Sequence, residues 1–182
     1  MHNSLVVNIL GGPGVGKSTI ASGVFSVLKM HGLNTEYVQE FAKDLTWVKD
    51  FNTLNIQPFV TAEQYRRQCI LSDVDVIITD AALLNGCLYI DNEEHKTMIM
   101  NLFKEFDTEN FVLTRNFQYV DKGRNQSENE SIAIDKKVLE ILDINNIPYT
   151  MIHGGYNAVN IIANDILKRF NKSSIYKMRL EC

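Results

Sequence analysis

The stretch Gly11-Gly12-Pro13-Gly14-Val15-Gly16-Lys17-Ser18 decides the fold, and it comes directly after the apolar run Leu5–Leu10. It fits the pattern G-x-x-x-x-G-K-[ST], which predicts a loop between a strand and a helix. Glycines let such a loop curl until successive backbone N–H groups point at phosphate oxygens. The positive end of the following helix attracts the same anion. A glycine-rich turn without a ligand is the alternative, but the flanking strand and helix patterns favour a nucleoside triphosphate site.

The residue types inside this stretch predict separate roles for its members. Lys17 has the length to reach the β- and γ-phosphates, and the Ser18 hydroxyl can join the shell of a Mg²⁺ ion. ATP and Mg²⁺ are therefore the expected cofactors. The expected phosphate contacts are Gly12, Pro13, Gly14, Val15, Gly16, Lys17, Ser18 and Thr19.

Length and composition favour one globular domain. The chain has 182 residues, of which 45% are hydrophobic, enough for a full core. No run approaches the roughly 18 apolar residues of a membrane span, and the N-terminus lacks the pattern of a secretion signal. Cys69, Cys87 and Cys182 follow no disulfide or metal spacing, so we expect a cytoplasmic protein.

The charge is uneven along the chain. The net charge of −4 argues against a general nucleic-acid binder, yet five basic residues and one acid lie from Lys168 onward. We expect a domain over residues 1–170 and a basic tail over 171–182. The tail is interpreted either as a solvated helix end or as a contact to nucleic-acid phosphates.

Apolar runs alternate with amphipathic segments, which predicts a parallel sheet with helices on both faces, a three-layer α/β sandwich. The region 50–58 is expected to be irregular, and Thr61 is expected to cap a helix over 61–72. The five expected strands cover residues 5–10, 35–39, 74–79, 110–114 and 149–152.

Two acids follow expected strands, where ligands of open α/β sheets bind. Asp80 follows a buried strand and suits a metal-binding or catalytic role, although a helix N-cap is the alternative. Glu40 follows the second strand and could take the proton from an attacking hydroxyl, although a surface acid is the alternative. Asp44 and Lys43 lie one turn further on.

The segment 115–129 is predicted to be a lid. It begins at a strand end and carries two arginines, Arg115 and Arg124, with Gly123 as a possible hinge. Arginines that close over a site exclude water and stabilise charge on a moving phosphoryl group. Gly155 is a candidate beside the nucleotide base, with a plain strand-to-helix turn as the alternative. Gln64, Gln68, Arg66 and Arg67 could face an acceptor, but only one helix face can do so, and solvated charge is the favoured interpretation for at least one of the arginines.

With these residues in place, the chain resembles the small P-loop kinases that act on nucleosides and nucleotides. It looks most similar to phage-encoded ATP-binding proteins related to the nicotinamide riboside kinase-like AAA group. Besides the first loop, the matching stretches are Gln39-Glu40-Phe41-Ala42-Lys43-Asp44-Leu45, Thr79-Asp80-Ala81-Ala82-Leu83-Leu84 and Gly123-Arg124-Asn125-Gln126.

The resemblance implies a P-loop NTPase sheet ordered 2-3-1-4-5, Mg-ATP as donor and a nucleoside-like acceptor. Some proteins of this kind phosphorylate 5-hydroxymethyluracil within phage DNA, which makes a DNA base a candidate acceptor in a host cytoplasm. One departure stands out, since deoxynucleoside kinases carry an Asp-Arg pair where this chain has Asp80-Ala81. The guanine-binding pattern Asn-Lys-x-Asp is absent, which disfavours GTP.

Three classes of function fit these observations. The favoured hypothesis is a kinase that moves the γ-phosphoryl of Mg-ATP to a hydroxyl of a nucleoside, nucleotide or DNA base. Its expected catalytic residues are Lys17, Glu40, Asp80, Arg115 and Arg124, with Ser18 and Asp80 as metal ligands. The alternatives are an ATPase or nucleotide switch that acts on a protein partner, and a nucleotide-binding scaffold without turnover. The sequence leaves open whether the protein is a monomer or a homodimer.

Overall fold

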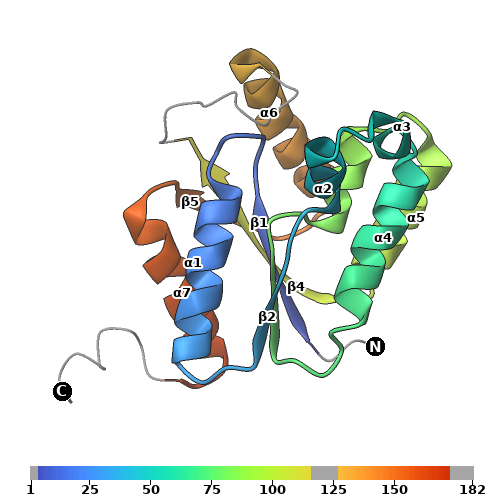
Figure 1. Ribbon diagram of the computed structural model, residues 1–182. Helices are drawn as coiled ribbons and strands as arrows, with labels where there is room; N and C mark the ends of the chain where they lie inside the picture. The colour runs from blue at the N-terminus through green and yellow to red at the C-terminus, as the bar shows by residue number, and fades with distance from the viewer. Residues whose placement is uncertain (1–3, 116–126, 173–182) are drawn as a thin grey trace.

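Five parallel strands form the sheet at the centre of the computed structural model, which describes residues 4–115 and 127–172 (Figure 1). Their order is β2-β3-β1-β4-β5, which confirms the implied order 2-3-1-4-5. The strands are β1 (Leu5–Leu10), β2 (Thr35–Val38), β3 (Val76–Thr79), β4 (Asp107–Thr114) and β5 (Thr150–His153).

Strand β1 lies in the middle of the sheet and is buried along its whole length. Alternate residues point to opposite faces, so Val7 and Ile9 join one core cluster while Val6 and Leu10 join the other. The strand is apolar except at Asn8, which is buried and donates to Asn110 Oδ1 at 2.9 Å, so its near-continuous apolar run fits a strand covered on both faces.

Helices cover both faces of the sheet and complete the predicted three layers (Figure 1). The helices α1 (Lys17–Met30) and α7 (Tyr156–Arg169) pack side by side on one face. The other face is covered by η1 (Leu83–Leu88), α5 (Glu93–Phe103) and α6 (Glu128–Ile144), with α4 (Gln57–Cys69) beside them. No helix in the described ranges is long and apolar enough to span a bilayer.

The region between β2 and α4 differs from the prediction. Residues 50–58 are not irregular: α3 (Phe51–Leu54) follows α2 (Phe41–Trp47), and α4 begins at Gln57. Thr61 is therefore inside α4, buried with 4% of its surface exposed, and does not cap the helix. Pro58 stands in the first turn of α4, where a proline without an N–H costs nothing.

The carboxyl ends of the five parallel strands meet at one edge of the sheet. Each is followed by a residue that the sequence singled out: Gly11 after β1, Glu40 after β2, Asp80 after β3, Arg115 after β4 and Gly155 after β5. The fold therefore gathers five segments that are far apart in the sequence at one edge.

Candidate active site

The loop between β1 and α1 has the backbone shape that anion binding requires. Gly14 and Gly16 have φ angles of +83° and +99°, in the left-handed region that side chains disfavour. Helix α1 begins at Lys17 without a capping side chain, so its first N–H groups are not covered from within. The Lys17 Nζ donates to the Gly12 carbonyl oxygen at 3.1 Å, which folds the side chain back over the loop.

Gly12 is fixed by the close approach of α6. A Cβ atom at this position would lie 2.4 Å from the Ser131 carbonyl oxygen and 2.8 Å from Asp135 Oδ1. The backbone N–H of Gly12 donates to that same Oδ1 at 2.5 Å. Only glycine leaves room for helix α6 to hold the loop in this way.

Arg115 lies against the same loop. Its Nε donates to Asp135 Oδ2 at 2.6 Å, and its Nη1 donates to the Pro13 carbonyl oxygen at 3.1 Å. Its Nη2 is buried without a hydrogen-bond partner. The Arg115 side chain thus bonds directly to the loop backbone at Pro13, and it shares the Asp135 carboxylate with the backbone N–H of Gly12. Arg124 and most of the predicted lid lie outside the described residues, as does the tail beyond residue 172.

Glu40 stands at the N-cap of α2, and its side chain makes no capping bond there. Glu40 lines a cavity and is half-buried, so its carboxylate can be reached from that cavity. Burial raises the pKa of its carboxyl above the ordinary 4.5, and the negative charge of Asp80 adds to this, whereas Lys17 and Lys43 oppose it. A carboxylate with a raised pKa is a better proton acceptor than an ordinary one.

Asp80 is almost completely buried, with 2% of its surface exposed, and its Oδ1 has no hydrogen-bond partner. The end of β3 is tied to β2 because the Thr79 hydroxyl donates to the Val38 carbonyl oxygen at 2.8 Å. The Thr79 Oγ1 also accepts the backbone N–H of Ala81 at 3.0 Å. One side chain therefore fixes the backbone on both sides of Asp80 and keeps it near the end of β2.

Tyr37 on β2 lies close to Asp80 and Ser18, a position that no motif in the sequence predicts. Burial raises the pKa of its hydroxyl strongly, and the charge of the Asp80 carboxylate and hydrogen bonding to it raise it further. Hydrogen bonding with Ser18 acts in the opposite direction. The Tyr37 hydroxyl therefore lies among the two predicted metal ligands, Ser18 and Asp80. A single Tyr in a four-residue strand belongs to no motif, so the sequence does not predict that its hydroxyl lies beside Ser18 and Asp80.

A cavity of about 680 Å³ opens beside the loop. Lys17, Ser18 and Glu40 line one part of it. The remainder is formed by α2, α3, α4 and η1, with side chains that are mainly apolar or amide-bearing. These lining residues include Trp47, Leu54, Asn55, Gln57, Val60, Gln64, Leu83, Asn85, Leu88 and Tyr89.

Two aromatic side chains at this cavity keep much of their surface accessible. Trp47 is 65% exposed and Tyr89 is 49% exposed. Burial of the Tyr89 hydroxyl within the concave wall raises its pKa to about 12, helped by the charge of Glu40. Tyr89 and Glu40 therefore share one cavity, and neither aromatic residue was assigned a role from the sequence.

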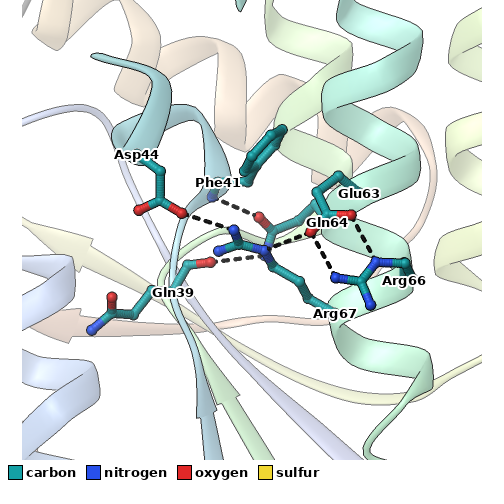
Figure 2. A network of polar contacts seen from close by, with 7 residues as sticks. All are labelled: Gln39, Phe41, Asp44, Glu63, Gln64, Arg66 and Arg67. Atoms are coloured by element: carbon teal, nitrogen blue, oxygen red, sulfur yellow. Dashed lines mark hydrogen bonds and ion pairs between the residues drawn. The ribbon is translucent and has the colours of Figure 1, made fainter. Parts of the chain in front are cut away.

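Several predicted acceptor contacts are engaged elsewhere (Figure 2). Arg67 pairs with Asp44 at 2.8 Å and with Glu63 at 3.1 Å, and Arg66 pairs with Glu63 at 2.7 Å. Neither arginine lines the cavity, nor does Asp44. The helices α2 and α4 pack together, and their charged side chains pair with one another.

The remaining candidates have mixed outcomes. Gln68 is buried, 2% exposed, and is not among the lining residues, whereas Gln64 lines the cavity. Lys43 lines it as well. Gly155 is the N-cap of α7 at the end of β5 and lies outside the lining.

The oxygen donors Ser18 and Asp80 fit a magnesium ion. Mg²⁺ is usually held by one or two protein oxygens together with substrate phosphates. The unpartnered Asp80 Oδ1 is such an oxygen, because a buried carboxylate oxygen needs a donor or a cation. The described residues contain no group of three or more His, Cys, Asp or Glu that could hold a metal alone.

The comparison with family models places this site in a known group. A family model described as "AAA domain" matches residues 6–158, which include the loop, Glu40 and Asp80. The chain belongs to this AAA domain family. No curated protein matches its sequence.

Solved structures share the fold of this AAA domain at low sequence identity. The NadR protein in complex with NR superimposes with a TM-score of 0.66 at 15% identity. The match covers 92% of this chain and 52% of that one, so the AAA domain spans about half the length of that protein. The deoxyadenosine kinase from M. mycoides with bound dATP gives a TM-score of 0.56 at 16% identity, covering 88% and 98% of the two chains.

Proposed function

We propose that this protein is an ATP-dependent phosphotransferase that moves the γ-phosphoryl of Mg-ATP to a hydroxyl of a nucleoside or nucleotide. The observation that carries the proposal is the position of Glu40 in the wall of a cavity of about 680 Å³ that the phosphate-binding loop lines as well. A carboxylate with a raised pKa that faces such a cavity is suited to take the proton of a bound hydroxyl.

The loop residues 12–19 hold the donor in this proposal. The backbone N–H groups from Gly14 to Thr19 surround the phosphates, and Lys17 moves from the Gly12 carbonyl oxygen to the β- and γ-phosphates. Ser18 and Asp80 hold the magnesium ion, which supplies positive charge to the phosphate oxygens when bound. The chain itself contributes the orientation of the donor and the exclusion of water from it.

Glu40 receives the proton of the acceptor. The hydroxyl oxygen forms a bond to the γ-phosphorus as the bond from that phosphorus to the bridging oxygen of ADP breaks. The hydroxyl proton passes to the Glu40 carboxylate, and ADP leaves with the electron pair of the broken bond. Arg115 beside the loop and Arg124 from the segment outside the described residues are proposed to stabilise charge on the transferred group.

The lining of the cavity suits a flat ring attached to a sugar. Trp47 and Tyr89 offer exposed aromatic faces, while Asn55, Gln57 and Asn85 offer amides that can bond to ring substituents. The two similar structures hold NR and dATP, and dATP is a flat ring attached to a sugar. A hydroxymethylated base in DNA is the remaining acceptor to be tested, because its hydroxyl also projects from a flat ring.

The test is transfer of labelled phosphate from γ-labelled Mg-ATP to a panel of nucleosides, nucleotides, plain DNA and hydroxymethylated DNA. We expect label in one acceptor class and slow release of free phosphate without an acceptor. Rapid release of phosphate regardless of acceptor would instead identify an ATPase or nucleotide switch. ATP binding without any turnover would identify a scaffold, and either result would overturn the proposal.

A further inference from the structure

The helix that follows Glu40 is capped from another element. Glu40 is the N-cap residue of α2, and its side chain accepts no N–H of the first turn. The backbone N–H of Phe41 donates instead to Gln64 Oε1 of α4, at 3.0 Å. Gln64 therefore satisfies the first backbone N–H of α2 from another helix, and the Glu40 carboxylate, which makes no capping bond, faces the cavity.

The same amide also bonds on the other side of Glu40. Gln64 Nε2 donates to the Gln39 carbonyl oxygen at 3.4 Å, a longer and weaker bond than the first. Figure 2 shows the Gln64 amide in contact with both neighbours of Glu40 in the chain. With 6% of its surface exposed, Gln64 is held inside the protein, so its two bonds fix the backbone from which the Glu40 side chain projects.

The surrounding contacts hold Phe41 from two further directions. The Arg67 guanidinium lies over the Phe41 ring, 4.8 Å from its centroid, and the Phe59 ring meets it edge-on at 5.7 Å. Arg67 is in turn held by Asp44 and Glu63 (Figure 2). These contacts position the α2 backbone relative to α4, and the Gln64 amide adds the hydrogen bonds nearest to Glu40.

We propose that Gln64 is a positioning residue for Glu40, and that its amide sets the location of the carboxylate relative to the phosphoryl donor. The inference rests on the proposed function, in which Glu40 accepts the proton of the acceptor hydroxyl. Gln64 also borders the cavity, but both polar ends of its amide are committed to the backbone of residues 39 and 41. It therefore acts on the reaction through Glu40 and not by binding the acceptor.

The test compares Gln64→Met with Gln68→Met. Methionine keeps the length of the side chain and removes both hydrogen bonds. Because misplacement of a reacting group by about 1 Å costs up to about 100-fold, we expect Gln64→Met to lower kcat by about 10- to 100-fold. The KM values for ATP and acceptor should change less than about threefold. Gln68 is one turn further along the same helix, equally buried, with its Nε2 unpartnered, so Gln68→Met should leave kcat within about twofold.

Gln64→Glu separates the two bonds and guards against a variant that fails to fold. Its carboxylate can still accept the Phe41 N–H but cannot donate to the Gln39 carbonyl oxygen. At alkaline pH, where Glu40 is ionised, this variant should retain more kcat than Gln64→Met. Equal losses in the two variants would overturn the role of the Phe41 bond.

A measurement independent of activity completes the test. Amide hydrogen exchange at Phe41 should be faster in Gln64→Met than in the wild type and unchanged in Gln68→Met. A rise in the acceptor KM at constant kcat would show that Gln64 binds the acceptor, and would overturn the proposal. If the wild type transfers no phosphoryl group, the proposed function fails and Glu40 loses its role. Slower amide exchange at Phe41 in the wild type than in Gln64→Met would then still show that Gln64 bonds to the first N–H of α2.

Discussion

Asp135 accepts the backbone N–H of Gly12 at 2.5 Å, and this bond joins helix α6 to the phosphate-binding loop across 123 residues of sequence. The other oxygen of the same carboxylate accepts Arg115 Nε at 2.6 Å. One side chain therefore holds the start of the loop and orients an arginine beside it.

Asp135→Asn should weaken binding of Mg-ATP by about 10-fold, because it removes the charge that holds Arg115 and loosens the loop at Gly12. Titration calorimetry with Mg-ATP measures the change. Asp143→Asn is the control, since Asp143 lies on the same helix and contacts only the exposed Tyr149 hydroxyl among the bonds described. Equal affinity in Asp135→Asn and the wild type would show that the loop holds its shape without α6.

Lys17→Ala should lower phosphoryl transfer by about 10²- to 10³-fold, because a positive charge that stabilises the transferring phosphoryl group is lost. Steady-state turnover at saturating Mg-ATP gives the comparison. Lys29→Ala serves as control on the same helix, because Lys29 is exposed and its pair with Glu36 at 2.8 Å is a surface ion pair of little energetic weight. Near-normal turnover in Lys17→Ala would remove the loop from the reaction.

Most of the fold could be predicted because its signals are local. The strand β1 and the start of α1 follow directly from an apolar run and a glycine-rich loop, and the structure has them at Leu5–Leu10 and at Lys17. The region 50–58 was predicted wrongly, since α3 is a single helical turn capped by the Asp50 side chain, which accepts the Thr53 N–H at 3.1 Å. So short a helix has no periodicity to detect.

The site was predictable only where its residues follow strand ends. Glu40 and Asp80 were found because the carboxyl ends of parallel strands share one edge. The bond of Asp135 to the Gly12 backbone and the bond of Gln64 to the Phe41 backbone were not predicted. Each joins segments that are distant in the sequence, and no spacing encodes such a contact. The ion pair of Arg67 could not be predicted either, because no spacing in the sequence shows that the Asp44 carboxylate of another helix lies 2.8 Å from its guanidinium.

Trp47→Ala should raise the KM for the acceptor by about 10-fold or more, the effect expected when one stacking surface for a flat ring is removed. The affinity for Mg-ATP and the thermal midpoint should stay close to those of the wild type, because Trp47 is 65% exposed. Val48→Ala is a matched control, exposed to 72% and outside the lining of the cavity. Should the acceptor KM be the same in all three proteins, the acceptor does not stack on Trp47.

Glu40→Gln should reduce kcat by about 10²- to 10⁴-fold while Mg-ATP still binds, because the proton acceptor is lost and the loop is untouched. In the wild type, kcat should fall as the pH drops through the pKa of Glu40, and burial places that limb above the ordinary 4.5. Glu36→Gln is the control, an acid on the neighbouring strand β2 whose ion pair with Lys29 at 2.8 Å lies at the surface, outside the lining of the cavity. A kcat for Glu40→Gln within a few-fold of the wild type would exclude Glu40 as the base.

The same substitution has an expected effect on stability, with a defined sign. A carboxyl whose pKa is higher in the folded than in the unfolded protein stabilises the fold below its unfolded pKa, and that contribution is lost as the pH rises through the folded pKa. Above its folded pKa the ionised Glu40 therefore destabilises the fold, and there Glu40→Gln should raise the thermal midpoint by about 1–3 °C. The gain should disappear at pH values where Glu40 is protonated. A midpoint that falls in Glu40→Gln at every pH measured would show that the Glu40 carboxylate stabilises the fold, contrary to the raised pKa.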